Sequence, residues 1–432
     1  MRVSTTLLAT SSLAAMLDQQ SKLSNTQKQV STGKRLLAPA DDPYGSARTL
    51  DLNKTIDTNT QYQSNAGQAT SRLSLEDGTL DSAGTALQRI RELMVTANND
   101  SQTPESRRFI SDEAKQLMDQ LVSLSNVRDS NGEYLFSGYQ GKTKPFGYDA
   151  TGNVQYYGDN GQRFLQVGTS SKVAVGDSGV DSFVAVKNGN GDFQSLDDAN
   201  NKGTGVIDPG TVSGNYIADN YTIKFLPPSS GNSQDPVEYY VLDGNNNIIV
   251  PSAQAGSSEA AFIAGGNAGI PYEEGAVIQG LDTKGVKTSI TGSPSASAGP
   301  PLQQDVFHVN PSSNESIFTT VKNFIDTLTG PQSTDAERAA FHNKMNRALS
   351  NLDQGVGRIL DVRARIGARL NTVDKQNSIN ESYTLQMKTT LSGIQDLDYA
   401  SAITTMNLQL TGLQAAQSAY AKIQGLSLFK YM

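Results

Sequence analysis

The sequence predicts an α+β protein, a long antiparallel helical coiled-coil rod built from both chain ends with a β-rich region inserted in the middle. Three observations lead to this prediction. Apolar residues recur in alternating steps of three and four along residues 52–97 and again along 349–394, as in the seams of long packed helices. Between these seams, Gly, Asn, Asp, Ser and Pro interrupt short β-rich runs over residues 141–312. Because neither long helix can bury its seam alone, the two most simply pack on each other.

Residues 1–42 are predicted to contain an inner terminal helix followed by a hinge. The hinge lies in "APADDPYGSA", where Pro39 interrupts the preceding helix. Asp41 and Asp42 then precede Pro43, and proline suits the first position of a new helix. The seam of the terminal helix consists of Leu13, Met16, Gln20, Leu23, Gln27 and Val30.

Residues 43–140 are predicted to form the N-terminal half of the rod. At 1.5 Å per residue, its main helix is expected to be about 70 Å long, which requires partner helices along its length. The seam of this helix is Leu52, Thr55, Asn59, Tyr62, Ala66, Ala69, Leu73, Glu76, Leu80, Ala83, Leu87, Ile90, Met94 and Ala97. The seam of a further helix is Ile110, Ala114, Leu117, Leu121 and Leu124.

Residues 141–312 are predicted to form one or two small β-rich domains inserted into the rod. The clearest strands are "NYTIKFL" (220–226) and "VEYYVLD" (237–243), which the loop "PPSSGNSQDP" joins. The runs "FLQVG", "KVAVG" and "DVFHVN" are further expected strands. The segment "SPSASAGPP" (293–301) is expected to be an exposed linker.

Residues 313–397 are predicted to form the C-terminal half of the rod. Three arginines, Arg358, Arg365 and Arg369, lie off its seam, so a solvated face is expected for them; contact with neighbouring copies is the alternative. The seam itself is Leu349, Leu352, Val356, Ile359, Arg363, Ile366, Leu370, Val373, Thr384, Met387, Leu391 and Ile394.

Residues 398–432 are predicted to form a second inner terminal helix, which pairs with the first. Asp396 and Asp398 lie near its start and are expected to act as a capping feature, because acids favour the positive end of a helix. The stretch "YASAITTMNLQLTGLQAAQSAYA" (399–421) contains no charged residue. Its central Thr, Asn and Gln side chains disfavour a membrane helix, and its seam disfavours a disordered tail. A helix whose two faces both meet protein is the preferred interpretation.

Composition argues against several functional classes. The chain has 35 Lys and Arg against 43 Asp and Glu, a net charge of −8, whereas a nucleic-acid binder needs a basic footprint. Cysteine is absent, and His308 and His342 fall in different predicted regions, where both are expected at the surface. No phosphate-binding or dinucleotide motif is present. We therefore expect no enzymatic activity, no catalytic residues, no cofactor and no metal. The N-terminus lacks the features of a cleaved signal peptide.

Both helical arms contain sequence stretches that resemble members of the flagellin superfamily. The stretches are "QVSTGKRLLAPADDPYGSA" (29–47), "LQRIRELMVTANND" (87–100) and "LSGIQDLDYASAITTMNLQLTGLQAAQSAYAKI" (391–423). The start "MRVST", the segment "SNGEYLFSGYQGKTKPF" (130–146) and the end "LSLFKYM" are similar to the family of flagellar hook–filament junction proteins, also called hook-associated protein 3.

This resemblance implies a structural protein of the bacterial flagellum, secreted through the flagellar type III pathway without a cleaved signal peptide. It implies a ring of copies that joins the first hook-associated protein to flagellin, and an export chaperone that binds the C-terminal region. No nucleic-acid or membrane partner is expected. The expected assembly interface is Leu13, Met16, Leu23, Val30, Ile403, Met406, Leu410, Leu413, Tyr420, Leu426, Leu428 and Phe429.

Three alternatives stay open at this point. The first alternative is flagellin itself, the filament subunit. An enzyme or carbohydrate-binding module in residues 141–312 would require a deep pocket with convergent polar groups. Finally, Arg89, Leu93 and Glu113 match positions that innate immune receptors read in some flagellins, so a recognition surface is the third alternative.

Overall fold

The computed structural model describes residues 5–232, 234–297 and 303–425. The chain divides into two compact units. Unit 1 comprises Met1–Gly67, Gln166–Lys172 and Val373–Met432, and unit 2 comprises Gln68–Leu165 and Val173–Thr372.

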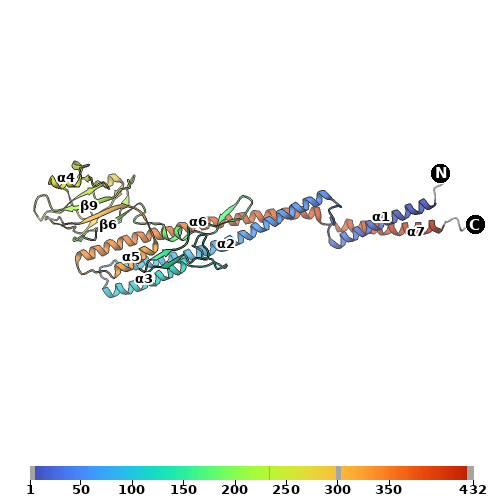
Figure 1. Ribbon diagram of the computed structural model, residues 1–432, viewed down its shortest axis with the longest axis horizontal. Helices are drawn as coiled ribbons and strands as arrows, with labels where there is room; N and C mark the ends of the chain where they lie inside the picture. The colour runs from blue at the N-terminus through green and yellow to red at the C-terminus, as the bar shows by residue number, and fades with distance from the viewer. Residues whose placement is uncertain (1–4, 233, 298–302, 426–432) are drawn as a thin grey trace, which may run out of the picture. The chain divides into compact units, whose positions relative to one another are not determined.

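Both ends of the chain are helical and the middle is rich in strands, which confirms the predicted fold class (Figure 1). Two of the helices, α2 and α6, contribute residues to both units. The α-helices are α1 (Thr5–Thr32), α2 (Pro43–Ala97), α3 (Pro104–Ser125), α4 (Glu259–Ala264), α5 (Ile317–Leu328), α6 (Asp335–Gln395) and α7 (Tyr399–Gly425).

Helices α2 and α6 are antiparallel in unit 2, as the seams predicted. Near the end of α2, Arg91 Nε lies 2.6 Å from Asp353 Oδ1. Further back along α2, Asp81 Oδ1 lies 2.6 Å from Arg363 Nη1. The residue number therefore rises along one helix as it falls along the other. The predicted α2 seam is buried or half-buried at every position except Thr55, because its small and apolar side chains form the helix contact.

Helices α3 and α5 complete the helical layer of unit 2. Helix α3 begins with Pro104 after the cap Thr103, whose hydroxyl accepts a hydrogen bond from Ser106 N. Helix α5 was not predicted as a separate helix, and it buries Phe318, Phe324 and other apolar residues against its neighbours. At the start of α6, Glu337 N donates to Thr334 Oγ1 and Thr334 N donates to Glu337 Oε2, which forms a capping box.

An aromatic cluster connects these helices to the strands that follow α3. Phe146 contacts Tyr156, Phe183 and Phe318, with ring centroids 5.1 to 5.8 Å apart within the cluster. Phe183 lies in η1 (Val180–Val184), a short π-helical turn. The hairpin of β1 (Phe146–Tyr148) and β2 (Val154–Tyr156) supplies Phe146 and Tyr156, and α5 supplies Phe318. This burial holds the segment after α3 on the helical layer.

A six-stranded antiparallel sheet forms the core of the β-rich region among the described residues. The predicted strands 220–226 and 237–243 are present as β9 and β10, paired from Leu226 and Glu238 onward. Phe193, Phe225 and Phe307 are fully buried on this sheet. The strands, in sheet order, are β11 (Ile248–Val250), β10 (Glu238–Leu242), β9 (Tyr221–Leu226), β17 (Val306–Pro311) and β6 (Phe193–Asp197), with β12 (Ile270–Pro271) on β10.

The strands outside this sheet form short two-stranded pairs. The predicted runs "FLQVG" and "KVAVG" are one such pair, and "DVFHVN" is β17 of the sheet. The pairs are β3 (Phe164–Gln166) with β4 (Lys172–Ala174), β5 (Val186–Lys187) with β18 (Asn314–Glu315), β7 (Val206–Ile207) with β14 (Ile290–Thr291), β8 (Thr211–Val212) with β13 (Val286–Lys287), and β15 (Ala296–Ser297) with β16 (Gln303–Gln304).

The expectation of an exposed linker at 293–301 is wrong for its described part. Pro294 is buried, and Ser295 N donates to Asp305 Oδ2 at 2.8 Å. Ala296 packs against the sheet core as part of β15. The small residues are therefore used for close packing and pairing instead of flexibility.

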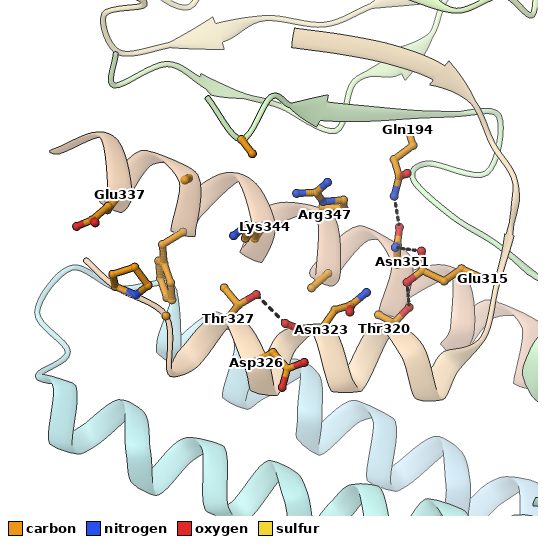
Figure 2. A pocket seen from close by; sticks show the side chains of 16 residues that line it. Gln194, Glu315, Thr320, Asn323, Asp326, Thr327, Glu337, Lys344, Arg347 and Asn351 are labelled. Atoms are coloured by element: carbon orange, nitrogen blue, oxygen red, sulfur yellow. Dashed lines mark hydrogen bonds between the residues drawn. The ribbon is translucent and has the colours of Figure 1, made fainter. Parts of the chain in front are cut away.

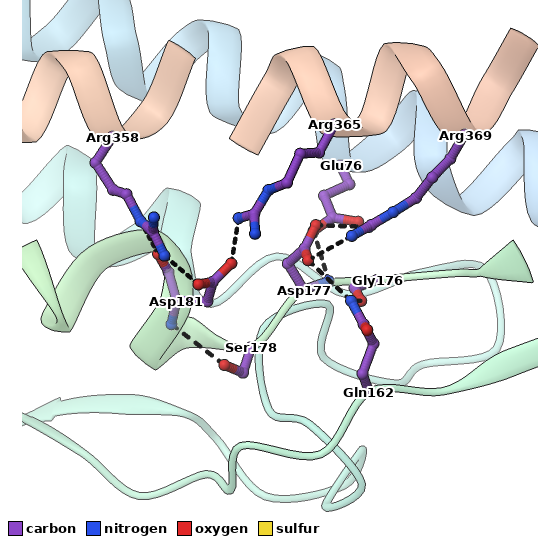
Figure 3. Close-up of polar contacts among 9 residues, drawn as sticks. All are labelled: Glu76, Gln162, Gly176, Asp177, Ser178, Asp181, Arg358, Arg365 and Arg369. Carbon is purple, nitrogen blue, oxygen red and sulfur yellow. Dashed lines mark hydrogen bonds and ion pairs between the residues drawn. The ribbon is translucent and has the colours of Figure 1, made fainter. Parts of the chain in front are cut away.

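The expectation of a solvated face is also wrong for Arg358 and Arg369, which are half-buried, whereas Arg365 remains exposed. Arg358 and Arg365 both pair with Asp181, which lies in η1 (Figure 3). Arg369 makes two hydrogen bonds to the Asp177 carboxylate, at 2.8 and 3.0 Å. Helix periodicity could not reveal this arrangement, because the acidic partners lie almost 200 positions earlier in the chain.

We expect Arg369→Ala to lower the free energy of unfolding by about 3–5 kcal/mol, because it leaves the buried Asp177 carboxylate without its charged partner. The Asp177 side chain is only 2% exposed and that of Arg369 18%. Arg365→Ala is the matched control, since the Arg365 side chain is 44% exposed and its loss should cost at most about 1 kcal/mol. Urea unfolding of the full chain measures both variants, and equal effects would contradict the assigned difference in burial.

Candidate assembly surface

The two terminal helices pair within unit 1. Helices α1 and α7 lie side by side and antiparallel (Figure 1). Midway along the pair, Gln19 Nε2 donates to Gln409 O at 3.3 Å, and at the joint Leu397 N donates to Gly33 O at 3.0 Å. The predicted pairing of the chain ends is therefore present.

The contact between α1 and α7 buries few side chains. On α1, Leu23 and Thr26 are buried, at 7% exposure each, and Met16 and Val30 are half-buried. On α7, Ala402 is the buried residue among those whose side chains are described. Four predicted interface residues, Met406, Leu410, Leu413 and Tyr420, are half-buried along the same helix.

The remaining predicted interface residues lie elsewhere. Leu13 and Ile403 are exposed by 45% and 44%, so neither belongs to the contact between the two helices. The less exposed positions are one residue away, at Ser12, which is half-buried, and at Ala402, which is buried. Leu426, Leu428 and Phe429 lie outside the described residues.

A set of large apolar side chains faces solvent on these two helices, and we call it the terminal apolar surface. Leu17 is 58% exposed and Leu408 is 70% exposed. Residues 399–421 of α7 carry no charge that would oppose covering this surface. Exposed apolar side chains gain stability when other protein covers them. The surface consists of Leu7, Leu13, Leu17, Ile403 and Leu408.

The joint between α1 and α2 is built from a glycine and two aspartates. Helix α1 ends at Thr32, and Gly33 follows with a φ of +70°. Pro39 therefore lies in the connecting loop and does not end the helix, contrary to the expectation. Asp41 Oδ2 accepts from the backbone N–H groups of residues 37 and 38, which closes this loop.

Helices α2 and α7, which follow the two connecting segments, each begin with a capping aspartate. Asp42 Oδ1 accepts from Gly45 N at 2.9 Å at the start of α2, with Pro43 in the first helical position. Asp398 Oδ1 accepts from Ala400 N at 3.0 Å at the start of α7. The expected capping is confirmed for Asp398, whereas Asp396 accepts from a serine hydroxyl of α6 instead.

The two connecting segments also bind each other. Arg35 N donates to Gln395 O at 2.8 Å, and the Arg35 guanidinium donates to Ile394 O. Lys34 and Asp396 form a backbone bridge. The predicted hinge residues thus lie in a joint whose two chains are hydrogen-bonded, which fixes where α1 and α7 start their pairing.

A cleft of about 610 Å³ between α5 and α6 is the strongest alternative site (Figure 2). Several of its charged lining residues already have structural partners. Glu315 accepts from Thr320 and Asn351, and Arg347 pairs with Asp197. Glu337 accepts from backbone N–H groups at the start of α6. The cleft therefore gives less support to an enzyme or binding module than the terminal apolar surface gives to assembly.

Both histidines were expected at the surface, but both are half-buried. His308 is half-buried on β17, where Thr222 lies at 3.2 Å, and burial lowers the pKa of its imidazole. His342 contacts Asn98 and Asp100 near the end of α2. Within the described ranges, no group of three or more His, Cys, Asp or Glu residues is arranged to hold a metal. No helix in the described part is long and apolar enough to span a membrane.

The three residues that resemble a receptor-binding surface lie on α2 and α3. Arg89 Nε donates to Glu113 Oε1 at 2.8 Å, and both side chains are exposed. Leu93 is only 5% exposed. A recognition surface here stays a hypothesis.

Two family descriptions match the helical ends of the chain. The bacterial flagellin N-terminal helical region matches residues 3–141, and the bacterial flagellin C-terminal helical region matches residues 349–432. Flagellin from Clostridium tyrobutyricum is 30% identical over 132 residues, which are 31% of this chain and 35% of that protein.

The relatives that match over the whole chain belong to a narrower class than flagellin. Flagellar hook-associated protein 3 of Escherichia coli is 23% identical over 430 residues, covering 100% of this chain and 99% of the relative. The crystal structure of flagellar hook-associated protein 3 from Legionella pneumophila is 32% identical with a TM-score of 0.70, covering 79% of this chain and 98% of that chain. FlgL from Xanthomonas campestris is 28% identical with a TM-score of 0.67, covering 79% and 99%. The chain belongs to the flagellar hook-associated protein 3 family.

Proposed function

We propose that this chain is a structural junction protein of the bacterial flagellum, joining the hook to the flagellin filament. The observation that carries the proposal is the pairing of α7, which is uncharged over residues 399–421, with α1, and this pairing leaves the terminal apolar surface exposed. Apolar surface of this extent gains stability when other subunits cover it. The similarity over the whole length to hook-associated protein 3, against one third of the chain for flagellin, favours the junction over the filament.

The partners follow from the same proposal. Copies of the chain form a ring, with the first hook-associated protein on one side and flagellin on the other. The expected interface residues on α1 and α7 contact neighbouring subunits, and the hinge residues set the direction in which the two helices leave the joint. A chaperone covers the C-terminal region before export through the flagellar type III pathway, without a cleaved signal peptide.

We also keep the five-segment division as part of the proposal. Residues 1–42 and 398–432 form the inner layer, 43–140 and 313–397 form the helical rod, and 141–312 form the outer β-rich region. On this division the protein acts through its interfaces and has no enzymatic activity.

Labelled-antibody microscopy of intact flagella tests the junction role. The label is expected as one short zone between hook and filament. A label along the whole filament would contradict the junction role and support flagellin. Loss of the gene should give hooks without filaments and flagellin in the medium, and a strain that still carries attached filaments would contradict the proposal.

We expect the double variant Leu17→Gln and Leu408→Gln to weaken assembly by more than about a hundredfold. Each leucine is exposed in the single chain, and covering it contributes about 1.5–3 kcal/mol. Filament attachment in cells and association of the purified protein with the first hook-associated protein measure the effect.

Leu360→Gln is the matched control, because Leu360 is a 54% exposed leucine on α6 in unit 2. All three changes should alter the free energy of unfolding by no more than about 0.5 kcal/mol each. Equal loss of assembly in the control would show that the effect is not specific to the terminal apolar surface.

A further inference from the structure

A buried glutamate lies inside the helical layer of unit 2 and belongs to no assembly surface. Glu76 on α2 is 0% exposed (Figure 3). Its Oε1 accepts from Asp177 N at 2.9 Å. Its Oε2 is buried and has no hydrogen-bond partner in the chain. Buried polar atoms are nearly always paired, so this oxygen requires a partner.

A second orphaned atom lies close by. Arg72 is one turn earlier on α2, and its terminal nitrogens contact Asp129 and the carbonyl oxygen of Tyr134. Its Nε is buried and has no partner. A guanidinium Nε–H is an obligate donor. One unpaired donor and one unpaired carboxyl oxygen therefore lie together in the interior.

Both atoms border a void beside Gly176. A Cβ built on Gly176 meets Arg72 Nε at 3.6 Å, Glu76 Oε2 at 3.8 Å and Leu135 O at 3.8 Å. Apart from Gly176 and its chain neighbours, no heavy atom comes closer. The space left by the missing side chain of Gly176, which we call the void, is thus bordered by three polar atoms. Buried waters typically make about three hydrogen bonds in such places.

We propose that the void beside Gly176 binds one internal water molecule, which accepts from Arg72 Nε and from the protonated Glu76 carboxyl group and donates to Leu135 O. The bonding balances in this form. Oε1 acts as the carbonyl oxygen that accepts from Asp177 N, and Oε2 carries the proton that is donated to water. Every polar atom around the void then has a partner.

The surroundings of Glu76 favour the protonated form. Burial raises the pKa of Glu76 to about 8, and the Asp177 carboxylate adds to the rise. Arg369 on α6 and Arg72 on α2 act in the opposite direction but are engaged with Asp177 and Asp129. Glu133 also lies within 4.0 Å of Arg72. These are the charged groups that face the site from the elements packed around it.

The variant Gly176→Ala distinguishes a void that holds water from one that is dry. The φ of Gly176 is outside the left-handed region, and 3.6 Å is an ordinary contact distance, so the methyl group fits. If water fills the void, the methyl group displaces it and leaves Arg72 Nε and Glu76 Oε2 unpaired, which lowers the urea midpoint. If the void is dry, the added methyl group raises the midpoint, and that result would overturn the proposal.

Gly84→Ala is the control, because its Cβ would meet the apolar Ile359 Cγ2 at 3.7 Å. This variant adds the same methyl group against apolar surface on α2, so its urea midpoint should rise. Opposite signs for the two variants support the hydrated site, and the same sign contradicts it.

Glu76→Gln tests the bound proton in the full chain. In the wild type, the folded pKa lies above the usual 4.5, so stability is fully present below pH 4.5 and is lost as the pH rises towards 8. The unfolding equilibrium constant should rise by up to about a thousandfold across this window. The glutamine cannot titrate, so the difference between the two proteins should grow over the window. A constant difference would overturn the proposal.

A crystal structure of the full chain at pH 6 observes the water directly. Density for one oxygen within hydrogen-bond distance of Arg72 Nε and Glu76 Oε2, absent in Gly176→Ala, is the expected result. An empty void in the wild type would refute the site whatever the variants do.

Discussion

A chain that lacks residues 403–432 is expected to leave cells with few attached filaments, whereas a chain that lacks most of the β-rich region keeps them. The truncation removes most of α7, including its side of the terminal apolar surface. Helix α1 then loses its partner, and a single helix of this kind has little stability in water. We expect at least about a tenfold difference in filaments per cell between the two deletions.

The structure supplies a clean way to remove the β-rich region. Strands β5 and β18 pair antiparallel on either side of residues 188–313, with Lys187 opposite Asn314. Replacing residues 188–313 by Asn-Gly joins these two strands in a two-residue hairpin. Excision between neighbouring chain positions is often tolerated. Asn343 and Arg347 of α6 lose partners in this variant, but these polar groups then face water.

Motility and filament attachment are scored for both deletions in a strain without the native gene. Secretion into the medium is measured beside them, so that failed export is not mistaken for failed assembly. If the excised variant sheds its filaments and the truncated chain retains them, the assignment of assembly to the chain ends is wrong.

The terminal helices of the single chain are expected to exchange their amide hydrogens almost without protection. Residues 5–33 and 400–425 should exchange within about tenfold of an unfolded peptide. Residues 68–97 and 349–372 should be protected by at least about a thousandfold, because only opening of the helical layer exposes them. Hydrogen exchange with mass spectrometry on the dilute, verified monomer measures both.

The physical reason is the small amount of surface that α1 and α7 bury on each other. Only Leu23 and Thr26 of α1 are buried among its described side chains. On α2, by contrast, Leu73, Leu80, Leu87 and Ile90 are each 0% exposed. Ordering a residue costs about 1–2 kcal/mol, which the terminal pair cannot offset without neighbouring subunits. This would keep the chain competent for export and unable to polymerise early.

The Leu17→Gln and Leu408→Gln variant is the control for this experiment, since it should leave monomer exchange unchanged while weakening assembly. Protection in the assembled state should then rise in the wild type and not in the variant. Strong protection of both ends in the monomer would mean that α1 and α7 form a folded domain before assembly.

The sequence by itself determined the helical arms, their antiparallel pairing and the main strands. An apolar period of three and four over Leu52 to Ala97 can be satisfied only by a long helix with a partner, and period-two runs such as 220–226 only by strands. Local signals also located Asp42 and Asp398 as caps, because capping involves neighbours in sequence. The resemblance of both arms to flagellins then indicated the superfamily.

Tertiary structure alone decided which side chains meet across long distances. Arg358, Arg365 and Arg369 look like a solvated face along α6, and only folding brings Asp177 and Asp181 to them. Periodicity placed Glu76 in a seam but could not show its unpaired oxygen or the void beside Gly176. On the terminal helices, a shift of one residue decided whether Ala402 or Ile403 is buried. Helix rotation depends on the partner surface, and sequence spacing fixes the face only to within about one position.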